Sequence, residues 1–185
     1  MTVNVKAVPV NGGSALEIDF VTASEKYSVE NLKKMSLDAE KKAEELVKSI
    51  IHGCETELQM ADAIHGYLAE NCRYDDALAD VSYTAYGALM NGEAVCQGYS
   101  AAFNVLCKNA GVKAIAVSND EHMWNMVLAD GKLYHYDVTY DDGKDGVLDA
   151  YKGIPEYAFV PDDMHKHYVL PAMQMFDYNK EINIQ

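Results

Sequence analysis

The stretch GEAVCQGYSAAFNVLCKNAG, residues 92–111, places a cysteine where a turn gives way to a helix. After Cys96 the apolar residues recur every three or four positions, and Gly111 is a typical helix stop. A thiol at the first turn of a helix lies at the positive end of the helix dipole, which favours the thiolate over the thiol. The sequence therefore predicts a helix that begins near Cys96 and carries a reactive sulfur.

Beyond this helix the apolar period changes to two. Three segments show the alternation: KAIAVS at 113–118, HMWNMVL at 122–128 and KLYHYDVTY at 132–140. They are predicted to be strands of an antiparallel sheet, with Asp130-Gly131 as a type I′ turn between the last two. Because helices come first and strands follow, the expected fold class is α+β.

The predicted hairpin determines which side chains share a face of the sheet. If Ala129 pairs with Lys132, His122 and Asp137 lie on one face as diagonal neighbours, with backbones about 7 Å apart. An imidazole and a carboxylate can meet over that distance, and the carboxylate can then fix the tautomer of the imidazole. His135 lies on the same face, so it is the alternative base.

The N-terminal part of the chain contains a predicted hairpin and two helices. TVNVKAVPV and SALEIDFVTA flank a Gly-rich turn, and residues 1–25 are interpreted either as an extra ribbon or as the end of a neighbouring domain. Residues 26–185 are interpreted as one domain. Apolar spacing predicts a long helix from Ser28 to about Gly53 and a second helix that ends near Asn71.

Cys96, His122 and Asp137 together have the chemistry of a nucleophile, a general base and an orienting acid. Each has an ordinary explanation when taken alone: a buried small hydrophobe, a satisfied core histidine and a residue that ends a strand. The combination favours catalysis, because all three residue types carry the required chemistry and the register places two of them on one face.

Three motifs in this order resemble the core of the bacterial transglutaminase-like superfamily, whose members are relatives of the papain-like cysteine proteases. The motifs are AVCQGYSAAFNVLCKNAGV, HMWNMVLADGKLYHYDVTYDD and YAFVPDDMHKHY, and the likeness runs from about Glu55 to Tyr168. The resemblance implies a transglutaminase-like or papain-like fold, with N-terminal helices and a central cysteine-bearing helix packed on an antiparallel sheet. It implies Cys96 as nucleophile, His122 as base and Asp137 as orienter.

The resemblance also implies a reaction, namely acyl transfer on peptide or amide substrates through a thioester. It does not fix the acceptor: water gives a protease, amidase or deamidase, and a lysine-type amine gives a crosslinking transglutaminase. Met123 stands where the family commonly has a small residue, which affects the expected pocket. The alternative hypothesis is a non-catalytic binding or structural module of a surface protein that retains the fold.

Five residues near the proposed triad are expected to form the substrate-binding cleft. Gly98 would let a substrate backbone approach the cysteine, Trp124 would form a wall, and N–H groups of the first helical turn would donate to an oxyanion. The expected cleft residues are Trp124, Gln97, Gly98, Tyr99 and Tyr83.

The charge of the chain limits its partners. Lys and Arg number 15 against 29 Asp and Glu, which gives a formal net charge of −14. This surface should repel nucleic acid and anionic lipid headgroups, so a peptide or protein substrate is the expected partner. No apolar run approaches the roughly 20 residues that span a bilayer, so no membrane insertion is expected. Intracellular action and action after removal of an export signal both remain open, as does the oligomeric state.

No cofactor and no metal are expected. The four cysteines include no CxxC pair. The acidic loop 141–150 does not fit an EF-hand, because Lys152 stands at the position of the twelfth-place glutamate. His165 and His167 are interpreted as part of an exposed segment rather than as metal ligands.

Overall fold

The computed structural model describes residues 2–10, 13–21, 27–142, 150–159 and 165. The chain divides into two compact units, residues 1–37 and 38–185. The first contains an antiparallel hairpin of β1 (Thr2–Val10) and β2 (Gly13–Val21), as the sequence predicts. The turn residues 11 and 12 and the acidic segment 143–149 lie outside the described residues, as does His167. The assignment of residues 1–25 to this domain or a neighbouring one stays a prediction.

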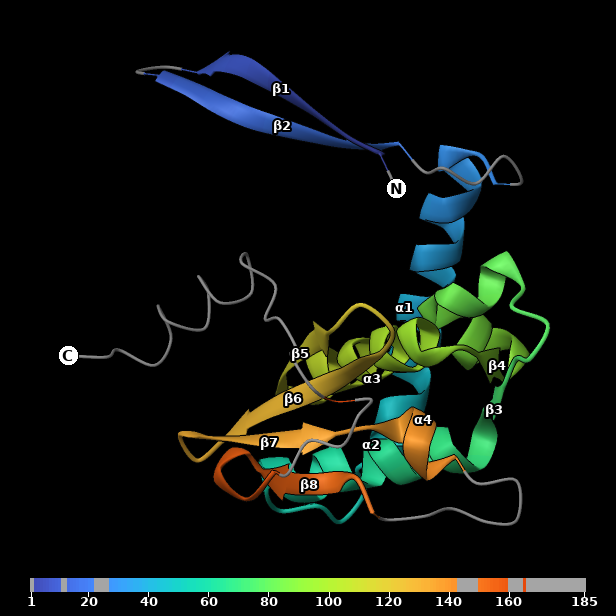
Figure 1. Ribbon diagram of the computed structural model, residues 1–185, viewed down its shortest axis with the longest axis vertical. Helices are drawn as coiled ribbons and strands as arrows, with labels where there is room; N and C mark the ends of the chain where they lie inside the picture. Colours follow the sequence, from blue (N-terminus) through green and yellow to red (C-terminus); the bar gives the residue numbers. More distant parts are fainter. Residues whose placement is uncertain (1, 11–12, 22–26, 143–149, 160–164, 166–185) are drawn as a thin grey trace. The chain divides into compact units, whose positions relative to one another are not determined.

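The second unit combines helices with an antiparallel sheet, which confirms the α+β class (Figure 1). The sheet has the order β5-β6-β7-β8, and a short parallel pair, β3 with β4, lies apart from it. The α-helices among the described residues are α1 (Val29–Ile50), which begins in the first unit, α2 (Glu57–Asn71), α3 (Cys96–Ala110) and α4 (Val138–Asp141). The strands are β3 (Arg73–Tyr74), β4 (Glu93–Ala94), β5 (Lys113–Ser118), β6 (Met123–Ala129), β7 (Lys132–Tyr136) and β8 (Lys152–Pro155).

Local sequence signals explain where the helices begin and end. The hydroxyl of Ser28 accepts a hydrogen bond from the N–H of Asn31 at 3.1 Å, which caps α1 as expected. Thr56 and Gln59 form a capping box at the start of α2. Gly111 ends α3 with a φ of 77°, a left-handed conformation that glycine adopts without strain.

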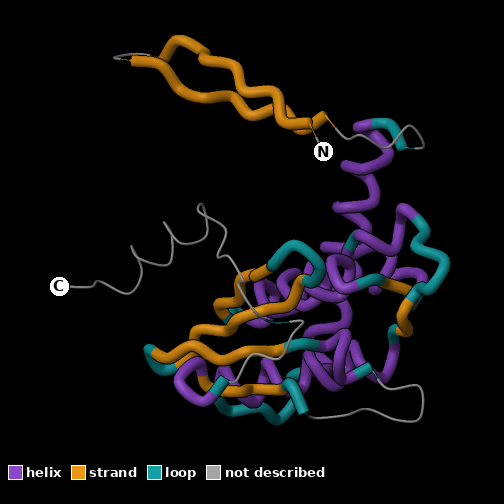
Figure 2. Tube along the Cα trace, viewed as in Figure 1, coloured by secondary structure: helices purple, strands orange, loops and turns teal. Residues whose placement is uncertain are grey.

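The sheet has an apolar layer on each face. Figure 2 shows the strands beside the helices, and α3 contacts both β5 and β6. One face, with Val127, Ala129 and Tyr136, belongs to the main core that includes buried residues of α2 and α3. The other face carries a smaller cluster around Trp124 and Met126. Both faces are therefore covered, which is why β6 is apolar at nearly every position.

Two segments differ from the expected secondary structure. Val138 to Tyr140, expected to extend the last strand, instead begin α4, because the Asp137 carboxylate accepts the N–H of Tyr140 and caps a helix there. The sheet also has a fourth strand, β8, which the sequence did not indicate. Among the described residues, no helix is both long and apolar enough to cross a membrane.

Candidate active site

Cys96 is half-buried at the first residue of α3. The turn before it is held by a hydrogen bond from the N–H of Val95 to the carbonyl of Ser82, at 3.0 Å. Gly98 packs against the same carbonyl, since a Cβ at this position would lie 2.2 Å from the oxygen of Ser82. The expectation that Gly98 opens a path for substrate is therefore wrong; this glycine lets the first turn of α3 seat on the segment beneath it.

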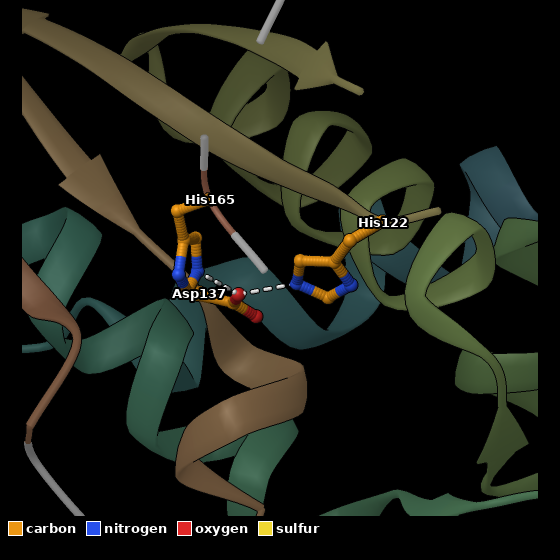
Figure 3. Close-up of side chains that lie close together, drawn as sticks. All are labelled: His122, Asp137 and His165. Atoms are coloured by element: carbon orange, nitrogen blue, oxygen red, sulfur yellow. Dashed lines mark hydrogen bonds and ion pairs between the residues drawn. The ribbon is translucent and has the colours of Figure 1, made fainter. Parts of the chain in front are cut away.

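The hairpin of β6 and β7 brings His122 and Asp137 together. Its register pairs Ala129 with Lys132, and the turn residues Asp130 and Gly131 have φ values of 50° and 69°, as a type I′ turn requires. His122 immediately precedes β6 and Asp137 immediately follows β7. Their side chains meet with 2.5 Å between His122 Nε2 and Asp137 Oδ2, as Figure 3 shows. The structure thus has both side chains on one face, within hydrogen-bond reach.

The orientation of the imidazole follows from this bond. An ionised carboxylate only accepts, so His122 Nε2 carries a proton and Nδ1 is the remaining ring nitrogen. In Figure 3 this second nitrogen points away from Asp137. His122 also interacts with the Cys96 sulfur, and because Asp137 engages Nε2, Nδ1 is the ring nitrogen available to exchange a proton with that sulfur.

The pKa shifts of Cys96 and His122 both favour the charged forms of these side chains. Burial raises the pKa of the Cys96 thiol, but the hydrogen bond and charge of His122, with the backbone N–H groups of Met123 and Gln97, lower it below its usual range. Burial would lower the pKa of His122, whereas hydrogen bonds and charge interactions with Asp137 and Cys96 raise it to about 9. The site thus favours a thiolate beside an imidazolium.

Asp137 is buried, with 2% of its surface exposed. Burial raises the pKa of its carboxyl, but hydrogen bonds and charge interactions with His122 and His165 hold that pKa below the usual range. His165 Nε2 lies 2.8 Å from Asp137 Oδ2. The expectation of an exposed segment is wrong for His165, which is fully buried against this carboxylate. Sequence reasoning assigned it no role, although it stands in the third motif of the family resemblance.

His135, the alternative base, lies elsewhere in the hydrogen-bond network. Its Nδ1 accepts the indole N–H of Trp124 at 2.9 Å, and its Nε2 is bonded to Glu156. Both ring nitrogens are therefore occupied. Burial also lowers the pKa of His135, which opposes the imidazolium form. The geometry favours His122 over His135 as the partner of Cys96.

A cavity of about 370 Å³ lies over the sulfur. The described residues that line it are Tyr74, Cys96, Glu121, His122, Thr139 and Tyr140. Tyr74 reaches the site because β3 pairs with β4, two residues before the cysteine. Sequence reasoning missed Tyr74, Glu121, Thr139 and Tyr140, because only the folded backbone places them around the sulfur.

None of the five residues expected in the cleft is among these described lining residues. Trp124 and Tyr99 are each 1% exposed, so neither forms a wall: Trp124 stacks beneath His122, and the Tyr99 hydroxyl donates to Asp142. Tyr83 is exposed but lies outside the lining. Gln97 contributes its backbone N–H to the sulfur.

Comparison with known proteins agrees with this architecture. The family model described as the transglutaminase-like superfamily matches residues 44–138, just over half of the chain. Kyphoscoliosis peptidase from Homo sapiens is 24% identical over 120 residues, which cover 54% of this chain and 18% of that protein. The chain thus spans less than a fifth of that curated relative.

Two solved structures are also similar. A crystal structure of a TGase has a TM-score of 0.53 and 13% identity, and the match covers 97% of this chain and 62% of that chain. A candidate cysteine protease from Cytophaga hutchinsonii has a TM-score of 0.49 and 10% identity, covering 82% of this chain and 66% of that chain. Because the sequence identity is only 13%, the similarity to the TGase structure shows a shared fold and nothing more.

Proposed function

Because this chain belongs to the transglutaminase-like superfamily, we propose that it catalyses cysteine-dependent acyl transfer on peptide or amide substrates through a thioester. One observation carries the proposal: His122, which is hydrogen-bonded to Asp137, lines an open cavity together with Cys96 and interacts with its sulfur. A substrate carbonyl that enters this cavity meets a sulfur paired with an imidazole.

The proposed reaction has two halves. The Cys96 thiolate attacks the carbonyl carbon, and the proton on His122 Nδ1 passes to the departing amine as the carbon–nitrogen bond breaks. A thioester remains. An acceptor then loses its proton to Nδ1 and attacks the thioester, and the thiolate leaves with the imidazolium restored. Asp137 holds Nε2–H throughout, so that Nδ1 always faces the sulfur.

We propose water as the acceptor, so the activity is that of a protease or amidase. A primary amine in its place would give transamidation by the same two steps. Turnover of a peptide library with and without an added primary amine separates these outcomes by mass, because only transamidation adds the amine to the product. Cys96→Ser is the control that must abolish both.

The non-catalytic alternative requires a covered cysteine. Cys96 instead lines the cavity and is only half-buried. Two other cysteines differ sharply from it: burial raises the pKa of Cys72 to about 11 and raises that of the fully buried Cys107 as well. The proposed reactive site is thus chemically distinct within the same chain.

Iodoacetamide labelling near neutral pH tests the proposal without knowledge of the substrate. Cys96 should be alkylated well before Cys54, Cys72 and Cys107, as read by peptide mass mapping. His122→Ala should remove this preference, and His52→Ala, a change at an exposed histidine, should leave it intact. Equal labelling of all four cysteines in the unmodified protein would contradict the proposal.

A further inference from the structure

His165 is a buried histidine beside the proposed triad that the two-step reaction does not use. It is 0% exposed and is not among the described residues that line the cavity. Its ring stacks on Tyr151, with centroids 4.9 Å apart, and meets the ring of Trp124 edge-on at the same centroid distance. These contacts hold the imidazole in one orientation, with Nε2 directed at Asp137 (Figure 3).

Three groups among the described residues donate hydrogen bonds to the carboxylate of Asp137. Oδ1 accepts the backbone N–H of Tyr140 at 3.2 Å, and Oδ2 accepts from both His122 and His165. In Figure 3 the two imidazoles lie on opposite sides of the carboxylate. Because an ionised carboxylate has no proton to give, both Nε2 atoms must carry one. The arrangement therefore fixes the carboxylate from both sides.

The same three side chains could be considered as metal ligands, since their ligand atoms all lie within 4.8 Å of one another. The distances from Oδ2 to the two nitrogens, 2.5 and 2.8 Å, argue against an ion between them. Ligands that each lie about 2.0–2.2 Å from a zinc ion in tetrahedral directions are more than 3 Å apart. Hydrogen bonds account for this cluster.

We propose that His165 is a positioning residue, which donates its Nε2–H to Asp137 Oδ2 and thereby holds the carboxylate in line with His122. This inference rests on the proposed function for its purpose, but its test does not require a substrate. His165 acts through Asp137 and His122, and it touches neither the sulfur nor the cavity among the described contacts.

The consequence reaches the sulfur in three steps. Hydrogen bonds from His165 and His122 help keep Asp137 ionised, the ionised carboxylate holds the His122 imidazolium, and the imidazolium favours the Cys96 thiolate. Without the His165 donor, the carboxylate keeps only its bonds to the Tyr140 N–H and to His122, and the imidazolium is held less firmly beside the sulfur. The fraction of thiolate at mildly acid pH should then fall.

Other titratable groups face this network and enter its pH dependence. Tyr140 of α4 meets the His122 ring edge-on, and Tyr74 and Glu121 share the cavity with the sulfur. Tyr151 stacks on His165, and His135 interacts with His165 by charge. All of them are unchanged in the variants below, so a difference between variants reports position 165.

The experiment measures the rate of Cys96 alkylation by iodoacetamide in His165→Phe and His165→Gln. Phenylalanine keeps the ring but has no donor, whereas the glutamine amide can place an N–H near the position of Nε2. At about pH 6 the rate in His165→Phe should fall about tenfold, and His165→Gln should stay within about threefold of the unmodified protein. At about pH 10, where the thiol ionises without help, all three rates should agree.

The opposite ranking would overturn the inference. If the ring matters only for packing, His165→Phe reacts normally at about pH 6 and His165→Gln is the slow variant. His165→Asn, whose shorter amide does not reach the carboxylate, replaces His165→Phe if that variant fails to fold by circular dichroism. Equal rates in all variants at about pH 6 also contradict the inference.

A second readout separates this inference from the proposed function. The titration of His122, followed by NMR of labelled histidine, should move to lower pH in His165→Phe and not in His165→Gln. If Cys96 of the unmodified protein shows no selective alkylation, the proposed function fails while this titration still decides the role of His165. If Cys96 is selectively alkylated and the titration of His122 is the same in all variants, only the inference about His165 fails.

Discussion

Asp137 supports more of this site than any other side chain. It immediately follows β7, caps α4 through the N–H of Tyr140, and binds two histidines through one oxygen. A carboxylate that accepts several hydrogen bonds strongly favours its ionised form, even when it is buried. The position therefore joins the end of a strand, the start of a helix and the charge state of His122 in one residue.

Asp137→Asn should lower the pKa of His122 from about 9 toward the ordinary value near 6.5. Desolvation remains in the variant and opposes the charged imidazole, while the opposite charge that outweighed it is gone. The measurement is an NMR titration of labelled histidine. The signal of the exposed His52 should not respond to the substitution. A His122 titration that stays near 9 would show that Asp137 is not the group that holds the imidazolium.

If the proposed acyl transfer takes place, its pH profile should be a bell whose alkaline limb lies at about 9. The thiolate exists above the pKa of Cys96, which lies below its usual range, and the imidazolium exists below the pKa of His122. Activity is therefore lost on the acid side as the sulfur gains a proton, and on the alkaline side as Nδ1 loses one. Release of p-nitrophenol from an activated ester, compared with Cys96→Ser, measures this profile. An alkaline limb near 6.5 would contradict the shift of His122.

Single positions show what the sequence can and cannot reveal about the site. Cys96, His122 and Asp137 were predicted as a group because helix-start chemistry and strand register are both readable from local sequence. The partners of a side chain are not readable in this way. Trp124 is a residue type that often forms the wall of a binding cleft. Its indole N–H instead donates to His135, and its ring is buried in the smaller apolar cluster of the sheet.

A second buried His–Asp pair ties the helices together. His65 of α2 and Asp141 of α4 are both fully buried, with 3.1 Å between His65 Nε2 and Asp141 Oδ2. The contact is not a hydrogen bond, and it becomes an ion pair when His65 is protonated. Asp141 also accepts the N–H groups of Ala150 and Tyr151, which lead into β8. Because Asp137 caps α4, this anchor helps fix the position of the acid in the proposed triad.

Asp141→Ala should lower the free energy of unfolding by about 3 kcal/mol, because the buried His65 loses this partner and the backbone N–H groups of Ala150 and Tyr151 lose their acceptor. Urea denaturation followed by circular dichroism measures the change. Glu70→Ala removes an exposed carboxylate from the same helix as His65 and should change the free energy of unfolding by less than about 0.5 kcal/mol. A loss below about 1 kcal/mol for Asp141→Ala would mean that the pair is not an anchor.

Two glycines in helices should respond to alanine in opposite ways. In Gly98→Ala the new Cβ would lie 2.2 Å from the carbonyl oxygen of Ser82, so the first turn of α3 must shift, at a cost of about 1–3 kcal/mol in the free energy of unfolding. In Gly66→Ala nothing lies within 4 Å of the new Cβ, and the helix should gain about 0.5–1 kcal/mol. Thermal denaturation of the two variants gives the comparison. A stable Gly98→Ala with unchanged Cys96 alkylation would show that α3 does not depend on this close approach.

Element boundaries were predictable wherever one residue type determines them, as at Ser28, Gly111 and the Asp130-Gly131 turn. The prediction failed at Val138, because a β-branched residue in an alternating pattern favours a strand while the preceding aspartate favours a helix start. In the structure the Asp137 cap prevails, and Val138 begins a helix. The fourth strand, β8, had no such signal: Lys152–Pro155 is a short segment whose pairing with β7 depends on long-range contacts.

The net charge of −14 should influence what reaches the cavity. Glu121 adds a carboxylate to the lining itself, whereas the His122 imidazolium acts in the opposite direction over a short range. Summed surface charge acts over roughly 30 Å at about 0.01 M salt and only about 3 Å at 1 M. At low salt the whole surface should therefore outweigh one imidazolium and favour cationic reagents and peptides.

Two methanethiosulfonates of similar size, one with a trimethylammonium group and one with a sulfonate, test this field at Cys96. Each rate is divided by the rate of the same reagent with mercaptoethanol, which removes intrinsic reactivity. At about 0.01 M salt the cationic reagent should be favoured by tenfold or more, and about 1 M salt should remove most of that preference, because only nearby groups then act on the reagent. Glu121→Gln should lower the preference that remains at high salt and leave its salt dependence nearly unchanged. If the preference for the cationic reagent does not vary with salt, it arises from groups in the cavity alone. If the sulfonate reagent is preferred at low salt, the imidazolium outweighs the surface charge.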